Sequence, residues 1–261
     1  MDTRVAVITG GAQGVGEATA KRLAKDGVMK FVLADIDGDK LKTVVDHLKK
    51  VGAEAHGVTG DLSKVENCTR VVKATIDHFG QIDVLINCAG STARGGILDT
   101  DEATFDRLFS ANVKAPFYMM QNTALEMLTR KSGVIVNIAS MLSYGGPPFL
   151  LTYSATKAAL VTLTKSVANT LKRDGIRVFA INLGWTVTPS EHKVQTTVHN
   201  MPEDWAARVG QTQPFGRLLV PDDAAGLVSF LVSKEANMMT GAIIDLEQFV
   251  AGTTEAVFGA T

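Results

Sequence analysis

Closely spaced glycines stand where an apolar run gives way to a helical pattern. The segment Thr9-Gly10-Gly11-Ala12-Gln13-Gly14-Val15-Gly16 follows the apolar run Val5–Ile8. Such a turn lets backbone amides approach a pyrophosphate, and the N-terminus of the following helix favours the negative charge. The plainer alternative is a strand–helix turn without a ligand. No Lys-Ser or Lys-Thr pair closes the glycines, which excludes the P-loop pattern.

An acidic residue, Asp35, ends the second apolar run, 25 positions after Gly10. A carboxylate there can accept hydrogen bonds from the hydroxyls of an adenosine ribose, and it would repel a 2′-phosphate. Its neighbour is Ile36, and the glycine turn carries Gln13, so neither place supplies the cation that a 2′-phosphate would require. These features favour NAD over NADP. A solvated aspartate at a strand end is common, so Asp35 indicates a dinucleotide site only in combination with the glycine turn.

Tyr153 and Lys157 stand four residues apart in a helical pattern, which places both side chains on one helix face. A cation near a phenol favours the phenolate, the form that can accept a proton. Ser140 follows the apolar run Val134–Ile138, at the strand end where open α/β sheets bind ligands. Asn112 lies in the long helical stretch before that run. Each residue alone has an ordinary structural interpretation: a turn serine, a buried amide or a solvated lysine. Their conjunction after a glycine turn indicates a catalytic site.

Alternating apolar and amphipathic stretches must position these residues. The apolar runs that predict buried strands are Val5–Ile8, Phe31–Ala34, Val84–Ile86, Val134–Ile138, Val178–Leu183 and Ala242–Ile244. The helical patterns are Val15–Asp26, Gly38–Val51, Lys64–Phe79, Phe105–Thr129, Tyr153–Arg173 and Asp222–Val232. This alternation predicts a doubly wound α/β fold, a parallel sheet flanked by helices. The stretch Thr186–Pro214 holds three prolines and no strong period, which predicts an irregular lid or binding loop.

The composition narrows the class of protein. The chain has 261 residues, a length that suits one or two domains, and its net charge is -1 from 26 basic and 27 acidic residues. That balance gives no support for nucleic-acid binding or a polybasic membrane anchor. No apolar stretch approaches the ~20 residues of a membrane helix, and the N-terminus does not resemble a signal peptide. The two cysteines, Cys68 and Cys88, exclude a disulfide scaffold and a zinc site of clustered cysteines. We expect a cytoplasmic protein without a metal.

Together these motifs resemble the compact, single-domain branch of the short-chain dehydrogenase/reductase family. The glycine turn matches its TGxxxGxG pattern, and the segment from Tyr153 to Lys157 matches YxxxK. Asn87-Cys88-Ala89-Gly90 stands where the family has NNAG, and Asp61 in Gly60-Asp61-Leu62 occupies a position that usually lies beside the adenine. The resemblance covers nearly the whole chain. It implies one Rossmann-type domain over residues 1–261, seven strands in the order 3-2-1-4-5-6-7, and a homotetramer.

The resemblance also implies roles for the candidate catalytic residues. Tyr153 would be the general base in oxidation and the general acid in reduction, and Lys157 would bind the nicotinamide ribose and lower the pKa of Tyr153. Ser140 would hydrogen-bond the substrate oxygen, and Asn112 would hold a water for proton relay. The nicotinamide would carry the hydride. We expect hydride transfer between NAD and a small secondary alcohol, such as a sugar, a polyol or a hydroxy acid.

The expected cofactor-binding residues come from the glycine turn, the ends of several strands, the YxxxK helix and the segment after the sixth strand. They are Gly10, Gln13, Gly14, Val15, Gly16, Asp35, Ile36, Asp61, Leu62, Asn87, Ala89, Gly90, Tyr153, Lys157, Gly184, Thr186 and Thr188. Two places depart from the family pattern. Phe179 and Leu183 stand for the Asn and Pro of Asn-x-x-x-Pro-Gly, and Glu247-Gln248-Phe249 stands where the family often has Asp-Gly-Gly.

The substrate is expected between the loop after the fourth strand, the segment after Ser140 and a lid formed by residues 184–215. The candidate substrate-binding residues are Arg94, Ser140, Leu142, Tyr153, Trp185 and His192. Trp185 is the better candidate for a pocket wall, because a single histidine in a polar loop is more often solvated. The mixture suggests a small polyhydroxylated or acidic alcohol rather than a steroid.

Three alternatives remain open at this point. The first is an NADPH-dependent ketoreductase, such as a 3-oxoacyl thioester reductase, against which Asp35 speaks. The second is a non-catalytic dinucleotide-sensing or scaffold protein, although such proteins often lose the Tyr or Lys that this chain keeps. The third is a nucleotide-sugar epimerase or dehydratase, which usually needs a larger C-terminal domain than 261 residues leave.

Overall fold

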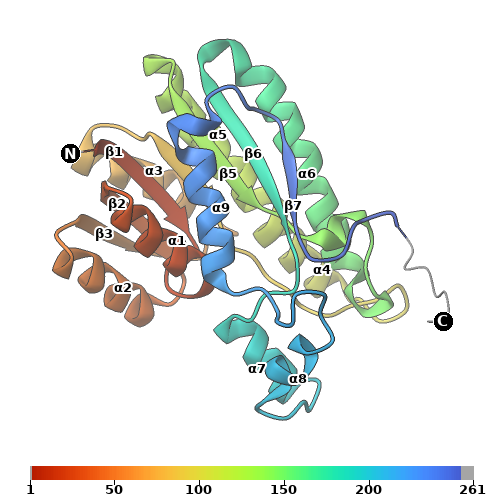
Figure 1. Ribbon diagram of the computed structural model, residues 1–261. Helices are drawn as coiled ribbons and strands as arrows, with labels where there is room; N and C mark the ends of the chain where they lie inside the picture. Colours follow the sequence, from red (N-terminus) through yellow and green to blue (C-terminus); the bar gives the residue numbers. More distant parts are fainter. Residues whose placement is uncertain (1, 254–261) are drawn as a thin grey trace.

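Seven parallel strands form the central sheet of this computed structural model, which describes residues 2–253 (Figure 1). Residue 1 and residues 254–261 of the expected domain lie outside the described residues. The sheet order is β3-β2-β1-β4-β5-β6-β7, so the expected doubly wound fold is confirmed. The strands are β1 (Asp2–Thr9), β2 (Val28–Asp35), β3 (Glu54–Thr59), β4 (Val84–Asn87), β5 (Gly133–Ile138), β6 (Ile176–Leu183) and β7 (Ile243–Leu246).

Strand burial explains which strands the sequence reveals. In β1, Ala6 and Ile8 pack on one face of the sheet and Val7 packs on the other, and all three are fully buried. A strand covered on both faces is apolar throughout and is easily recognised. The strand β3 lies at the edge of the sheet, and only Ala55 and Val58 of its six residues are buried. It therefore carries no apolar run, and the sequence patterns do not reveal it.

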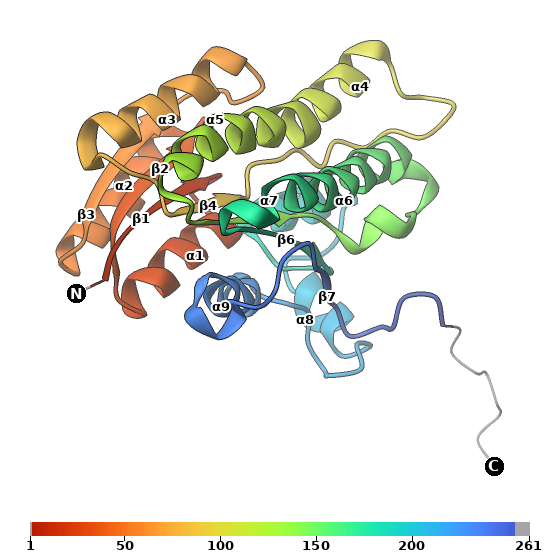
Figure 2. The ribbon, with the colours of Figure 1, turned by 90° about the horizontal axis from the view of Figure 1, so that it is seen from above.

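Helices cover both faces of the sheet. One face packs against α1 (Gly14–Lys25), α2 (Gly38–Lys50) and α9 (Pro221–Val232), and the other against α3 (Val65–Phe79), α5 (Ala115–Arg130) and α6 (Leu151–Leu171). Figure 2 shows α3, α5 and α6 along one side of the sheet and α1 and α9 along the other. Within residues 2–253, no helix combines the length and the apolar character needed to cross a membrane.

The long helical stretch before β5 is interrupted at Asn112. The structure has α4 (Glu102–Phe109), a π-helical turn at Ser110–Lys114, and then α5. Pro116 has no N–H, so the carbonyl of Asn112, four residues earlier, has no α-helical donor. The single helix expected over Phe105–Thr129 is therefore wrong in this detail. π-Helical turns of this kind often occur at functional sites.

The segment expected to be irregular contains two short helices. The helix α7 (Pro189–Thr197) begins after Thr188, whose side chain accepts a hydrogen bond from the N–H of Glu191, and Pro189 occupies its first turn. The helix α8 (Trp205–Gly210) begins with a fully buried tryptophan. Capping threonines and first-turn prolines favour helix starts, so these residues begin a helix where their number suggested a loop. Both helices lie beyond the carboxyl ends of the strands (Figure 1).

Candidate active site

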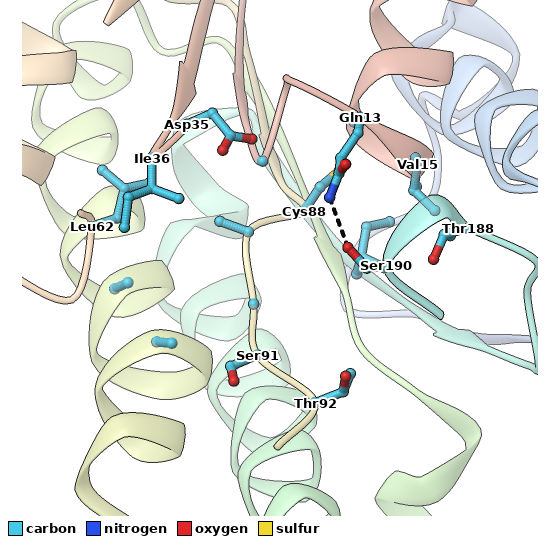
Figure 3. Close-up of a pocket in the computed structure, with 18 of the residues that line it drawn as sticks. Gln13, Val15, Asp35, Ile36, Leu62, Cys88, Ser91, Thr92, Thr188 and Ser190 are labelled. Atoms are coloured by element: carbon cyan, nitrogen blue, oxygen red, sulfur yellow. Dashed lines mark hydrogen bonds between the residues drawn. The ribbon is translucent and has the colours of Figure 1, made fainter. Parts of the chain in front are cut away.

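A cavity of about 450 Å³ lies at the carboxyl ends of β1, β2 and β4, beside Tyr153 and Lys157 (Figure 3). This volume is in the range of small-molecule sites. Fourteen of the expected cofactor-binding residues line it: Gly10, Gln13, Gly14, Val15, Gly16, Asp35, Ile36, Asp61, Leu62, Ala89, Gly90, Tyr153, Lys157 and Thr188. The fold thus brings together residues that are up to 178 positions apart in the sequence.

The glycine turn needs its glycines for close backbone approach. Gly10 has φ +66°, and a Cβ on it would lie 2.8 Å from the backbone nitrogen of Ala89. A Cβ on Gly16 would lie 2.1 Å from the carbonyl oxygen of Gly10, closer than any real contact. The helix α1 begins directly after Gln13, whose side chain does not cap it. The first N–H groups of α1 therefore remain available to an anion at this edge of the cavity.

The carboxylate of Asp35 is held in place by two backbone amides. One oxygen accepts a hydrogen bond from the N–H of Ala12 and the other from the N–H of Asp37, both at 3.0 Å. Each carboxylate oxygen keeps a further lone pair for a ligand hydroxyl. Lys157 is the one cationic side chain among the described residues that line the cavity. Lys40, five residues after Asp35, forms an ion pair with Asp37, in which the ammonium lies 2.8 Å from the carboxylate.

Ser140, Tyr153 and Lys157 converge from two elements. Ser140 directly follows β5 and caps a short 3-10 helix, accepting a hydrogen bond from the N–H of Leu142 at 3.2 Å. Tyr153 and Lys157 lie on α6, and the Lys157 ammonium is 5.7 Å from the centre of the Tyr153 ring. The same ammonium donates a hydrogen bond to the carbonyl oxygen of Ile138 at 2.8 Å. The arrangement places a hydroxyl, a phenol and an ammonium group beside one another.

Burial shifts both titrating groups of this cluster. It raises the pKa of Tyr153 to about 12, against the effect of a hydrogen bond with Ser140. The charge of Glu191 raises the same pKa further, and that of Arg94 lowers it. Burial lowers the pKa of Lys157 to about 8. The expected lowering of the pKa of Tyr153 by Lys157 is not seen: burial is the largest cause of the shift, and the charges that act on the phenol are those of Glu191 and Arg94. At neutral pH the phenol is protonated and ready to donate.

Asn112 is 1% exposed and uses its side chain within the protein. Its Oδ1 accepts from the N–H of Ser91 at 2.7 Å, and its Nδ2 donates to the carbonyl of Ser91 at 2.9 Å and to Oγ1 of Thr156 at 3.0 Å. These bonds tie the π-helical turn to the loop after β4 and to α6, one residue before Lys157. The role of Asn112 in holding a water stays a prediction.

Comparison with known proteins identifies the family. Residues 4–199 match the family model of short chain dehydrogenases. The chain belongs to the short-chain dehydrogenase family. It is 34% identical to galactitol 2-dehydrogenase of Agrobacterium fabrum, over 91% of this chain and 93% of that protein. Among solved structures, it is similar to NAD⁺-bound xylitol dehydrogenase (28% identity, TM-score 0.87, 95% of this chain and 99% of that one). It is also similar to the L-sorbose reductase of Gluconobacter frateurii with NADPH and L-sorbose (28%, TM-score 0.90, 97% and 100%).

This short-chain dehydrogenase is therefore an oxidoreductase of a family that uses nicotinamide dinucleotides. The expected family and Rossmann-type architecture are both confirmed. Similar structures hold NAD⁺ in one case and NADPH in another. The choice between the two cofactors must therefore be argued from the residues of this chain.

Several expected site residues lie outside the lining of the cavity in the described part of the chain. Asn87 is buried below it, where its Nδ2 donates to Oδ1 of Asn137 across β4 and β5 at 2.8 Å. Gly184 is covered by Glu247, because a Cβ on Gly184 would lie 2.3 Å from the Glu247 carboxylate. Thr186 donates to the carbonyl of Gly184 at 3.0 Å. Of these three residues, Thr186 supports neighbouring backbone. Ser140 and Asn112 are not part of the lining either, but each directly follows a lining residue, Ala139 or Ala111.

Other residues line the cavity although their spacing gave little signal. They are Gly60, Ser63, Cys88, Ser91, Thr92, Ala111, Ala115, Ile138, Ala139, Leu183 and Ser190. Gly60 and Cys88 belong to segments that carry the family resemblance, so they were within reach of the sequence. Ser190 was not predicted, because it lies in the segment that was expected to be irregular. Its Oγ accepts a hydrogen bond from Nε2 of Gln13 at 2.7 Å, which joins the start of α7 to the glycine turn (Figure 3).

The aromatic residues of the lid hold it together. The ring of Trp185 stacks on the buried ring of Trp205 at 5.5 Å, and Nε1 of Trp185 donates to Glu191 at 2.9 Å. His192 accepts from Nε1 of Trp205 at 3.1 Å and bonds to Glu203 at 3.0 Å. Both ring nitrogens of His192 are thus occupied in joining α7 to α8. The substrate contact expected of His192 stays a prediction, and Trp185 is 41% exposed.

Proposed function

We propose that this short-chain dehydrogenase is an NAD-dependent oxidoreductase acting on a small secondary alcohol, such as a sugar, a polyol or a hydroxy acid. The observation that carries the cofactor assignment is the Asp35 carboxylate, held at the cavity by Ala12 and Asp37. A 2′-phosphate beside it would be repelled, since two unit charges ~4 Å apart near a protein surface interact by about 4 kcal/mol. The neighbouring Ile36 and Gln13 supply no compensating charge.

In the proposed reaction the bound nicotinamide supplies or accepts the hydride. Ser140 holds the substrate oxygen by a hydrogen bond, and the Tyr153 hydroxyl donates the proton that this oxygen gains on reduction. Lys157, fixed by the carbonyl of Ile138, orients the ribose beside Tyr153. The raised pKa of Tyr153 keeps the phenol protonated at neutral pH, the form that reduction requires, whereas oxidation requires the phenolate.

We further propose that residues 184–215 form the substrate lid and that a homotetramer acts in the cytoplasm. The lid assignment is supported by the position of α7 and α8 beyond the strand ends and by the bond between Gln13 and Ser190. The one-domain assignment is supported by the single sheet that gathers all these residues.

The cofactor test compares kcat/KM for NAD and NADP in the wild type and in Asp35→Ala. We expect the wild type to prefer NAD by about 100-fold or more, and the variant to lose about 10-fold or more with NAD while improving with NADP. Asp39→Ala removes the same charge from an exposed position of α2 and is the control. A wild type that prefers NADP tenfold would contradict the assignment and favour the ketoreductase alternative.

The catalytic test uses Tyr153→Phe with a panel of secondary alcohols and ketones, read by NADH absorbance. Turnover should fall by orders of magnitude, while NADH binding, measured by fluorescence, persists. Near-normal turnover in Tyr153→Phe would refute the catalytic assignment. Tight NADH binding by the wild type with no turnover of any alcohol or ketone would support the dinucleotide-sensing alternative instead.

A further inference from the structure

We infer that Arg94 binds an anionic oxygen group of the substrate, so that the substrate of this enzyme is a hydroxy acid or its oxo form. This inference rests on the proposed function and narrows its substrate class. Arg94 lies in the loop that follows β4, two residues after Thr92, which lines the cavity. The side chain is partly buried.

The guanidinium of Arg94 has donors left over. Nη1 donates to the carbonyl of Thr92 at 2.8 Å, and Nη2 lies 3.4 Å from Nε2 of His199. Nε is buried and has no hydrogen-bond partner. No carboxylate among the side chains described for residues 2–253 forms an ion pair with Arg94. A buried donor without an acceptor is costly, and a guanidinium presents its donors in a fork that matches a carboxylate.

The guanidinium of Arg94 also affects Tyr153, the residue proposed to transfer the proton. Its charge lowers the pKa of Tyr153, so it lies close to the phenol that exchanges the proton. A substrate whose carbinol oxygen lies between Tyr153 and Ser140, and whose neighbouring substituent reaches Arg94, would bring that substituent to a donor without a partner. A carboxylate in that position would complete the donor set of Arg94, whereas a neutral hydroxymethyl group would leave the charge uncompensated.

Glu191 is the opposing charge at this site, and it limits where the anion can lie. It also acts on Tyr153, and its Oε1 accepts from Nε1 of Trp185 at 2.9 Å and from Nε2 of Gln195 at 2.8 Å. These bonds hold Glu191 on the lid. The structure shows no pairing between Glu191 and Arg94, although both act on the same phenol. The site therefore keeps a positive side at Arg94 and a negative side at the lid, and a substrate carboxylate is directed to the former.

The experiment compares alcohols that differ only in charge: 3-hydroxybutyrate with butane-1,3-diol, and lactate with propane-1,2-diol, each as both enantiomers. The dinucleotide is whichever one the wild type prefers. We expect kcat/KM to favour the acid by about 10-fold or more in the wild type. Arg94→Gln should abolish this preference through KM, Arg94→Lys should keep part of it, and Glu191→Gln should increase it. Arg173→Gln, an exposed arginine at the amino end of β6, removes the same charge far from the site and should retain the preference.

Two further readouts separate a binding role from a structural one. Malonate should bind to the NADH-loaded wild type by calorimetry at least about 10-fold more tightly than propane-1,3-diol, and Arg94→Gln should remove the difference. Arg94→Gln should also move the pH profile of alcohol oxidation to higher pH, because the charge that lowers the pKa of Tyr153 is gone. NADH binding should be unchanged, since Arg94 does not line the cofactor cavity.

The inference is overturned if the wild type favours neither the acids in turnover nor malonate in binding, or if Arg94→Gln keeps both preferences. That result would leave the proposed function intact wherever Tyr153→Phe still abolishes turnover. If the wild type oxidised no alcohol at all, the proposed function would fail, and the malonate measurement would still decide the role of Arg94.

Discussion

Replacing Lys157, the buried lysine of the proposed catalytic site, should lower activity without lowering stability. Lys157 is 6% exposed, and burial lowers its pKa from 10.5 to about 8. Keeping its charge in the folded state therefore costs about 3 kcal/mol at neutral pH, at ~1.4 kcal/mol for each pH unit between the two values. Lys157→Met removes this cost, and it also removes the donor to the carbonyl of Ile138, a loss of about 1–3 kcal/mol. We expect the variant to be at least as stable as the wild type at pH 7 and nearly inactive.

The pH dependence gives this prediction its sign. The pKa of Lys157 is lower in the folded than in the unfolded chain, so between about pH 8 and 10.5 the unfolded chain binds one proton more. The free energy of unfolding of the wild type must then rise with pH in this window. Lys157→Met lacks this contribution, while Tyr153 is present in both proteins and cancels. Between pH 7 and pH 9.5 the wild type should gain about 2 kcal/mol relative to the variant.

The assay is urea unfolding of both proteins at the two pH values, without dinucleotide and at one protein concentration. Lys165→Met, an exposed lysine of α6, controls for the substitution itself. Unfolding free energies that change in parallel with pH in the wild type and Lys157→Met would refute the reasoning. So would a variant that is several kcal/mol less stable than the wild type at both pH values, since the buried charge would then be a net source of stability.

Three further predictions concern the same site. Alcohol oxidation should rise about tenfold per pH unit from pH 7 to 9, because it needs the phenolate of Tyr153, whose pKa is about 12; a flat profile of kcat/KM would contradict this. Gly16→Ala should weaken NADH binding at least about tenfold in a fluorescence titration, because its Cβ would lie 2.1 Å from the oxygen of Gly10; unchanged affinity would show that the turn relaxes. Gln13→Ala should speed NADH release severalfold in stopped-flow experiments, since it removes the 2.7 Å bond to Ser190, and an unchanged release rate would exclude a closing role for that bond.

The part of the site that could be predicted from the sequence rests on short-range spacing. The glycine turn and the pair Tyr153 and Lys157 each lie within one strand–helix connection or one helix, so their relative positions follow from local geometry. Asp35 could be placed because β2 is buried and apolar up to that residue. The topology then brought these separate pieces to one edge of the sheet, as parallel strands require.

What the sequence concealed depends on partners distant along the chain. The strand β3 has no apolar run, because four of its six residues are exposed. The helices α7 and α8 are held by the stacked rings of Trp185 and Trp205 and by the bonds of His192, none of which has a periodic signature. The π-helical turn at Asn112 had a local signal, the proline four residues later. A proline predicts a kink or a break in a helix, but it does not specify a π-helical turn.

The pKa shifts of the catalytic pair are the clearest case in which spacing and environment disagree. Spacing puts Lys157 next to Tyr153 and so argues for a lower phenol pKa, but burial acts on both groups and disfavours the charged form of each. The result is a protonated phenol beside a lysine whose pKa lies only about one unit above neutral pH, a pair suited to donate a proton to a carbonyl. An oxidised nicotinamide carries a positive charge, which in such a buried place favours the phenolate. The charge of the oxidised ring would then lower the pKa of Tyr153 from its buried value, in the direction that oxidation requires.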